Sequence, residues 1–375
     1  MKKVLVIQRR MTHYRVPFFE TLRAQLNCNN LALTVAYGSP ALSEISKEDK
    51  GDLSWGINLP TKYLFGDKIC LQPFGKLIPD ADVIIIAHEN KLLYNLAVQY
   101  GSPLKRVILW GHGANLQGNK ASLKERFKKK TAAHADWWFG YTEHSRPIIQ
   151  SSGFPADRIT VLNNSIDTDE LKLAIKAAKR SEVAALRQKH NLDAGPIGIF
   201  VGSLYKEKRI EFLLKAAEII RKAVPSFQLV VVGDGTDREI VTNFANSHPW
   251  THYMGVQSGN AKAELLSLSD VVLNPGLVGL GILDSFVAEA PLITTDCGLH
   301  SPEISYLKHA VNGLCTENSI VSFSDAAISL LSSDQRHGIL SQGCAESASQ
   351  YTLNNMAQRF CDGVLQCLAN PIIRK

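Results

Sequence analysis

The sequence lacks an apolar run long enough to cross a membrane, and its start, MKKVLVIQRR, has only four consecutive apolar residues before Gln8. A signal peptide needs an apolar core of about 7–15 residues, and a transmembrane helix needs about 20. We therefore expect a cytoplasmic protein with neither element. The run KKVLVI is instead typical of a first buried strand in a parallel sheet.

Paired cysteines are also missing. The seven cysteines stand apart, with no CxxC spacing, at positions 28, 70, 297, 315, 344, 361 and 367. Neither a zinc site nor a disulfide framework is indicated, and a reducing cytosol fits this pattern. No DxD pair stands at the end of a predicted strand, so we expect no obligatory divalent metal and no bound cofactor.

The sequence also lacks a large excess of charge of either sign. It has 41 Lys and Arg and 35 Asp and Glu, a net charge of +6. This mild excess favours an anionic ligand or surface and does not indicate nucleic acid. At 375 residues the chain exceeds what one hydrophobic core usually organises, so we expect two domains. With 45% hydrophobic residues, long disordered spans are not expected.

Short runs rich in Val and Ile alternate with helix-length amphipathic segments, which predicts an α/β fold with two Rossmann-like, doubly wound domains facing across a cleft. Strands are expected at 4–7, 31–36, 83–87, 107–110, 138–141, 160–162, 198–201, 228–232, 251–254, 271–273 and 292–294. Residues 169–191 are polar, rich in Lys and Ala, and end before Gly195–Pro196. We expect a first domain at 1–175, a linker at 176–195 and a second domain at 196–354, with a helix at about 355–375 returning to the first domain.

The glycines Gly276, Gly279 and Gly281 follow an apolar run and precede a helix-like segment. Their order, G-x-x-G-x-G, differs from the dinucleotide fingerprint G-x-G-x-x-G, so nicotinamide and flavin cofactors are not indicated. Earlier in the chain, Lys206, Lys208 and Arg209 stand where another helix begins, although cations there oppose the helix dipole. A solvated loop and an anion site both explain these cations.

The blocks VGSLYKEKR, VVGDGTD, LNPGLVGLGILDSFVAEAP and CGLHSPEISYLKHAVNG occur in this order within residues 198–313. They resemble the donor-binding domain of retaining glycosyltransferases with the GT-B fold, family 4. The resemblance implies a nucleotide-sugar donor of the UDP or GDP type. It also implies that Lys208 neutralises the donor diphosphate, that Asp284 replaces a glutamate on the ribose hydroxyls, and that the glycines allow close backbone approach.

Other positions of the same blocks are expected to contact the donor. These are Ser203, Lys206, Arg209, Gly233, Gly276, Val278, Gly279, Leu280 and Glu303. Two of them depart from the family pattern, because Gly276 replaces a sugar-binding glutamate and Ser203 replaces a diphosphate-binding arginine. The departures leave open a different donor sugar, another source of positive charge such as Lys206 or Arg209, or loss of activity.

In the first domain, the resemblance assigns His112, between Gly111 and Gly113, to a catalytic place near the transferred sugar. It also assigns residues to the acceptor or the cleft, namely His13, Arg15, His88, Asn90 and Asn164. The sequence motif HYRVPFF resembles a subset of these glycosyltransferases that builds bacterial surface polysaccharides. Several residues have a second explanation, because His13 suits a surface, Asn164 suits a turn, and Glu303 suits the start of a helix.

A basic segment runs from Lys120 to Lys130, with six basic residues against the single acid Glu125, and with Leu123 and Phe127 on one helical face. Such a helix is typical of a membrane-surface element, and a solvated helix is the alternative. If the acceptor is lipid-linked, peripheral contact with an anionic membrane at the inner face of the cytoplasmic membrane follows.

We therefore expect a retaining glycosyltransferase that serves cell-envelope glycan synthesis, using a lipid-linked or polysaccharide acceptor. In a front-face displacement, the protein stabilises charge that builds on the departing phosphate. A non-catalytic sugar-nucleotide-binding protein and a nucleotide-sugar 2-epimerase remain alternatives. An epimerase needs carboxylates around the sugar, and Gly276 lacks one.

Overall fold

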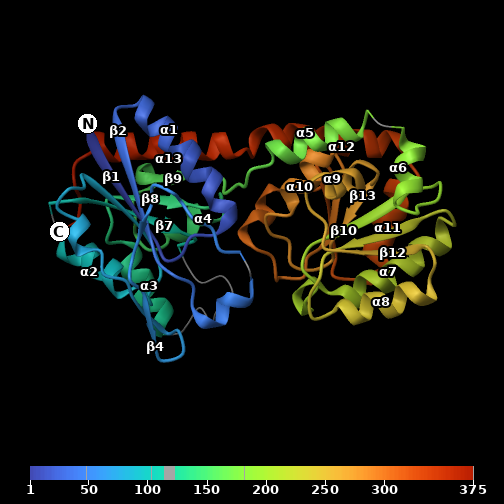
Figure 1. Cartoon of the computed structure of the whole chain (residues 1–375), viewed down its shortest axis with the longest axis horizontal. Coiled ribbons are helices and arrows are strands. Elements are labelled where there is room, and N and C mark those ends of the chain that lie inside the picture. The colour runs from blue at the N-terminus through green and yellow to red at the C-terminus, as the bar shows by residue number, and fades with distance from the viewer. Residues whose placement is uncertain (48, 103, 114–122, 181, 375) are drawn as a thin grey trace. The chain divides into compact units, whose positions relative to one another are not determined.

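The computed structural model describes residues 1–47, 49–102, 104–113, 123–180 and 182–374, and the chain divides into two compact units (Figure 1). Unit 1 contains Met1–Asp167 and Thr352–Lys375, and unit 2 contains Thr168–Tyr351. Each unit has a parallel sheet covered by helices. The predicted α/β class with two Rossmann-like domains is confirmed.

The sheet of unit 1 is parallel throughout its described strands. In spatial order it contains β3 (Ile57–Asn58), β2 (Leu31–Tyr37), β1 (Lys2–Gln8), β6 (Val83–Ala87), β7 (Arg106–Gly111), β8 (Trp137–Gly140) and β9 (Ile159–Val161). Val4 and Val6 of β1 enter the core on one face, and Leu5 and Ile7 enter the core on the other. The strand is apolar without alternation because helices cover both faces of the sheet.

The remaining elements of unit 1 are η1 (His13–Arg15), α1 (Val16–Cys28), η2 (Leu42–Lys47), the antiparallel hairpin β4 (Lys62–Leu64) and β5 (Ile69–Leu71), η3 (Gly75–Leu77), α2 (Leu93–Gly101), α3 (Leu123–Ala132), α4 (Ser145–Gln150), η4 (Ala156–Arg158) and α13 (Leu353–Ala369). The last helix, α13, lies alongside α1 although they stand at opposite ends of the chain (Figure 1). The Phe18 and Phe360 rings pack 5.6 Å apart, and Gln25 Nε2 donates to Asn354 Oδ1 at 2.8 Å. The ring contact and the hydrogen bond hold the C-terminal helix α13 within unit 1.

The sheet of unit 2 has the order β12 (Thr251–Gly255), β11 (Gln228–Val232), β10 (Ile197–Val201), β13 (Val271–Leu273), β14 (Leu292–Thr295) and β15 (Gly313–Thr316). In chain order within the unit this is 3-2-1-4-5-6, the Rossmann arrangement, which reverses direction between β10 and β13. Its helices are α5 (Asp169–Ala178), α6 (Val183–Lys189), η5 (Lys206–Lys208), α7 (Ile210–Ala223), α8 (Arg238–Ser247), α9 (Gly259–Ser267), α10 (Ile282–Ala288), η6 (Pro302–Tyr306), α11 (Ile320–Leu331) and α12 (Asp334–Gln350). Loops at the carboxyl ends of β10 and β13 are therefore neighbours.

The sequence analysis did not predict β3, the β4–β5 hairpin or β15, all of which are too short for a clear apolar pattern. The segment expected as a linker, 176–195, contains the end of α5 and all of α6. These helices belong to unit 2, because α5 packs against α9 and Lys189 and His190 bind the Glu264 carboxylate of α9 at 2.7 and 2.8 Å. The division between the units instead follows Asp167.

Candidate functional site

In unit 2, the loop after β13 is bound to the segment that begins α7. Leu277 N donates to the Glu207 carbonyl oxygen at 2.8 Å, and Lys208 Nζ donates to the Leu277 carbonyl oxygen at 2.6 Å. Arg209 Nη1 donates to the Pro275 carbonyl oxygen at 3.1 Å. The cations at the start of α7 therefore hold the glycine-containing loop in place.

Gly276 lies at the centre of this contact. A β-carbon at this position would stand 2.2 Å from the Glu207 carbonyl oxygen and 2.7 Å from Lys208 Cα. Both distances fall well below van der Waals contact, and the atoms met are backbone atoms that cannot rotate away. Glycine is therefore required at 276 by close packing, and a glutamate would displace the segment that carries Lys208.

Lys208 has a partly buried ammonium group. Among the described residues, no carboxylate lies within ion-pair distance of it, and burial lowers its pKa to about 8. Lys208 lines a small cavity together with Val278, Gly279, Gly281 and Asp284. A desolvated cation without a counter-charge is costly, and an anion bound beside it would remove that cost.

Asp284 lies in the first turn of α10, and its side chain is buried. Its Oδ2 accepts a hydrogen bond from Lys262 Nζ of α9 at 2.8 Å. The sequence analysis missed Lys262, which stands in the segment NAKAELL without a motif of its own. The carboxylate expected to bind ribose is thus already oriented by a cation.

His300 is a second residue that the sequence analysis missed. Its Nδ1 accepts from Val278 N at 3.2 Å, while its Nε2 lies 2.7 Å from the Thr295 carbonyl oxygen and donates to it. Burial lowers the pKa of His300, which keeps the neutral form that this arrangement needs. The imidazole therefore braces the loop around Val278.

The other expected donor residues are less closely gathered. Ser203 and Lys206 are exposed, and Arg209 is occupied by Pro275 and by Thr295 Oγ1 at 3.0 Å. Leu280 is half-buried in the glycine loop, and Glu303 is buried in η6. Gly233, with φ of +139°, packs on the Gly202 carbonyl, so its role is to let two strand ends meet.

In unit 1, His112 follows β7 and packs on Tyr141 with ring centroids 4.4 Å apart. Burial, followed by the charges of Lys128 and Arg15, lowers the pKa of His112 to about 4. His88, at the end of β6, lies 3.0 Å from Thr131 Oγ1, and burial lowers its pKa to about 3. Both imidazoles are therefore neutral near pH 7.

The remaining unit 1 residues differ in burial. His13 is exposed in η1, Arg15 is buried, and Asn90 is half-buried after β6. Asn164 is buried, and its backbone N–H donates to the Tyr141 carbonyl oxygen at 2.8 Å. Arg15, His112 and Tyr141 form one group at the carboxyl end of the sheet.

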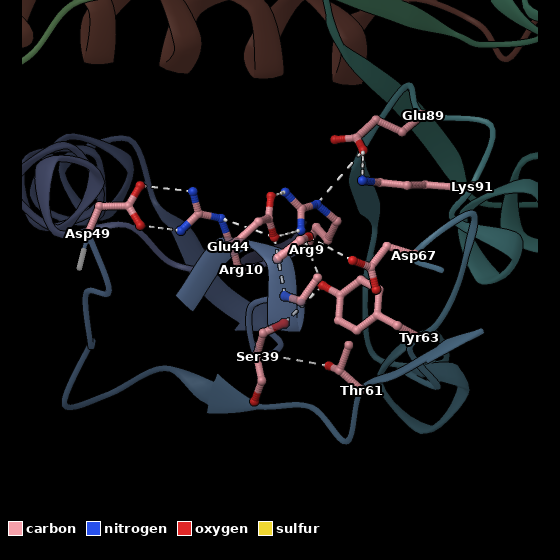
Figure 2. A network of polar contacts seen from close by, with 12 residues as sticks. Arg9, Arg10, Ser39, Glu44, Asp49, Thr61, Tyr63, Asp67, Glu89 and Lys91 are labelled. Atoms are coloured by element: carbon pink, nitrogen blue, oxygen red, sulfur yellow. Dashed lines mark hydrogen bonds and ion pairs between the residues drawn. The ribbon is translucent and has the colours of Figure 1, made fainter. Parts of the chain in front are cut away.

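A network of ion pairs also stands at this end of the sheet (Figure 2). Arg9 binds both oxygens of Glu44 at 2.6 and 2.7 Å, and Arg10 binds both oxygens of Asp49 at 2.5 and 2.8 Å. The hydrogen bonds from Arg9 lower the pKa of Glu44 to about 2. The sequence analysis did not consider these arginines, although two adjacent arginines directly after β1 were a visible signal.

Only part of the basic segment Lys120–Lys130 can be placed, because 114–122 lie outside the described residues. From Leu123 the chain forms α3, on which Phe127 is 47% exposed and Lys129 and Lys130 are exposed. No helix within the described ranges is both long and apolar enough to pass through a membrane. In the same part of the chain, no three His, Cys, Asp or Glu side chains are grouped as metal ligands.

Comparison with known proteins shows that part of unit 2 resembles a described protein family. Residues 195–333 match the family model described as "Glycosyl transferases group 1". Alpha-D-kanosaminyltransferase of Streptomyces kanamyceticus is 28% identical over 148 residues, which cover 38% of this chain and 37% of that protein. A Mycobacterium tuberculosis GDP-mannose-dependent alpha-(1-6)-phosphatidylinositol monomannoside mannosyltransferase is 24% identical over 272 residues, covering 68% of this chain and 69% of that protein.

Among solved structures, HepE of Anabaena in complex with UDP superposes with a TM-score of 0.69 at 13% identity, covering 98% of this chain and 100% of that one. The domain match and the named relatives support a glycosyltransferase. The structural likeness shows that its fold is GT-B, as the sequence resemblance implied.

Proposed function

We propose that the protein transfers a sugar, with retention at the anomeric carbon, from a UDP- or GDP-sugar to a lipid-linked or polysaccharide acceptor of the cell envelope. Lys208 carries this proposal, since its ammonium group is partly buried and has no carboxylate partner in the described ranges, and it lines a cavity with Asp284 and the glycine loop. A GDP-mannose-dependent relative and a UDP-bound structural neighbour support the donor class.

In this proposal, Lys208 stabilises the negative charge that develops on the departing diphosphate. Asp284 accepts hydrogen bonds from the ribose hydroxyls, and the backbone at Gly279 and Gly281 lets the diphosphate approach. His112, neutral at pH 7, donates or accepts a hydrogen bond near the transferred sugar rather than supplying charge. We propose that no divalent metal is required, so a chelator should leave turnover unchanged.

A panel of UDP-, GDP- and ADP-sugars tests the proposal by thermal shift and by release of free nucleotide, with and without membrane lipid extract and chelator. We expect one nucleotide class to shift the melting temperature and to be released when an acceptor is present. Lys208→Ala should abolish release, while Lys215→Ala on the exposed side of α7 should not. No shift with any nucleotide sugar would refute the proposal.

The same assay separates the two alternative functions. Binding without release, even with acceptor extract, would indicate a non-catalytic sugar-nucleotide-binding protein, which the packed Gly276 makes a specific alternative. Interconversion of the free nucleotide sugar without acceptor would indicate a 2-epimerase. We further propose that the protein acts in the cytoplasm, in peripheral contact with the inner face of the cytoplasmic membrane through the segment 120–130.

A further inference from the structure

Unit 1 has a hollow of about 170 Å³ at the carboxyl ends of β1, β6 and β7. Its lining includes Arg15, Thr12 and three aromatic side chains, Tyr14, Trp110 and Tyr141. This hollow is formed entirely by residues of one unit. Its geometry can therefore be considered without reference to unit 2.

Arg15 is the unusual residue of this hollow. It is only 8% exposed, and among the residues that the structure describes its buried Nη1 has no hydrogen-bond partner. Its guanidinium carbon stands 5.1 Å from the centre of the Trp110 ring and 5.7 Å from the Tyr141 ring. The aromatic rings attract the guanidinium charge, but they are not the in-plane oxygen acceptors that its N–H groups bind best.

The neighbouring charges are already paired, as Figure 2 shows for Arg9, Arg10 and Lys91. Arg9 and Arg10 bind Glu44 and Asp49, and Lys91 Nζ lies 3.6 Å from Glu89. The charged residues that line the hollow, together with their ion-pair partners, are four cations and three carboxylates: Arg9, Arg10, Arg15 and Lys91 against Glu44, Asp49 and Glu89. Of these four cations, Arg15 has no ion pair within the described part of the chain.

A buried cation whose N–H donor lacks an acceptor destabilises the fold, unless a bound ligand supplies the acceptor and the opposite charge. The guanidinium fork matches the paired oxygens of a carboxylate or a phosphate, which it binds through parallel hydrogen bonds. The electrostatic potential at neighbouring His112 also favours an anion, because the positive charges of Lys128 and Arg15 add to burial in lowering the pKa of His112. An anion in the hollow would offset that potential.

We propose that this hollow binds an anionic group of the acceptor, a carboxylate or a phosphate carried by a saccharide, through Arg15. The acceptor is accordingly an acidic or phosphorylated sugar rather than a neutral one. The identification of the ligand as the acceptor rests on the proposed function. The anion site itself rests on the geometry of unit 1.

The test uses the full chain and three small probes: glucuronate, glucose 6-phosphate and glucose. Binding is followed by calorimetry and by the NMR signals of His112, which report on this hollow rather than on unit 2. We expect at least one charged probe to bind about tenfold or more tightly than glucose and to raise the pKa of His112. Whichever charged probe binds better identifies carboxylate or phosphate as the source.

Arg15→Gln should lose that preference, while Arg23→Gln should keep it. Arg23 is a matched control because it also lies over an aromatic ring, that of Trp55 at 4.5 Å, but is exposed. If Arg15→Gln does not fold, Arg15→Lys keeps a charge without the fork. In that variant, binding weakened at least threefold supports the proposal, and unchanged binding refutes it.

Two further results would overturn the proposal. One is equal binding of all three probes by the wild-type chain. The other is a loss of UDP binding in Arg15→Gln without any loss of sugar-anion binding, which would assign Arg15 to the donor. Because anion binding at Arg15 should persist in Lys208→Ala, failure of donor turnover and failure of this anion site are separate outcomes.

Discussion

Gly276 packs against Glu207 so closely that a β-carbon at 276 would stand 2.2 Å from the Glu207 carbonyl oxygen. The Leu277 N–H donates to that same oxygen at 2.8 Å, so the contact is a bonded arrangement of two loops. The glycine at 276, where the resembled pattern has a glutamate, is therefore coupled to the position of the segment that carries Lys208.

Gly276→Ala should lower the free energy of unfolding by about 1–3 kcal/mol, because the added methyl group overpacks a rigid backbone contact. Gly281→Ala is the matched control in the same loop, since its β-carbon would meet no atom within 4 Å. Denaturant unfolding of both variants measures the difference. Equal stability of the two variants would contradict the packing explanation.

Affinity for UDP or GDP should fall as the pH rises above about 8, because Lys208 then loses its proton in the free protein. The expected decline is up to about tenfold per pH unit until the higher pKa of the nucleotide-bound lysine is reached. Calorimetry between pH 6.5 and 9.5 measures it. Lys208→Arg, which stays charged, should show a flat profile, and a decline like that of the wild type would exclude Lys208 as its source.

Asp284→Ala should weaken UDP binding by about 10–100-fold, because one or two hydrogen bonds from the ribose to a charged acceptor are lost. Pyrophosphate binding should not weaken, because the ribose is absent and Lys262 is released from its 2.8 Å ion pair. Asp325→Ala on the exposed face of α11 serves as the control. An equal loss for both ligands would remove Asp284 from the ribose.

Acid should destabilise unit 1 through His88 and His112. Their pKa values, about 3 and about 4, are depressed, so the unfolded chain binds more protons than the folded chain below pH 6.5. Stability is thus fully present above pH 6.5 and is lost as the pH falls toward 4, by up to about 1.4 kcal/mol per pH unit for each histidine.

Denaturant unfolding at pH 4.5 to 7.5 checks this dependence. His88→Gln should make it less steep, with the His112 contribution remaining, while His13→Gln, at an exposed position, should leave the slope unchanged. A slope in His88→Gln as steep as that of the wild type would show that the acid sensitivity arises elsewhere.

The double variant Lys129→Glu/Lys130→Glu should bind vesicles containing phosphatidylglycerol more weakly than the wild-type chain. Each basic residue near such a surface contributes about 1 kcal/mol, and salt should release the protein. Lys172→Glu/Lys176→Glu on the exposed side of α5 is the charge-matched control. Sedimentation with vesicles measures binding, and equal losses in both double variants would argue against a specific membrane-facing helix.

The sequence by itself determined most strands, because a strand buried on both faces must be apolar without a break, as in KKVLVI and QLVVV. It also indicated the glycine loop, and the resemblance of its ordered blocks singled out Lys208 and Asp284 as candidate donor-binding residues, which stays a prediction. Only the tertiary structure decided how these residues are held. Lys208 meets the Leu277 carbonyl across 69 positions, and Asp284 meets Lys262 across 22.

The same holds for α13, whose return to α1 depends on apolar contacts between opposite ends of the chain. It holds as well for Arg15, which a local pattern shows only as a basic residue before a helix. That Arg15 has no ion pair among the placed residues follows from the pairing of Arg9 and Arg10 with acids far along the chain. Long-range contacts of this kind carry no local periodicity, because packing of the whole unit, rather than neighbouring residues, selects the partner.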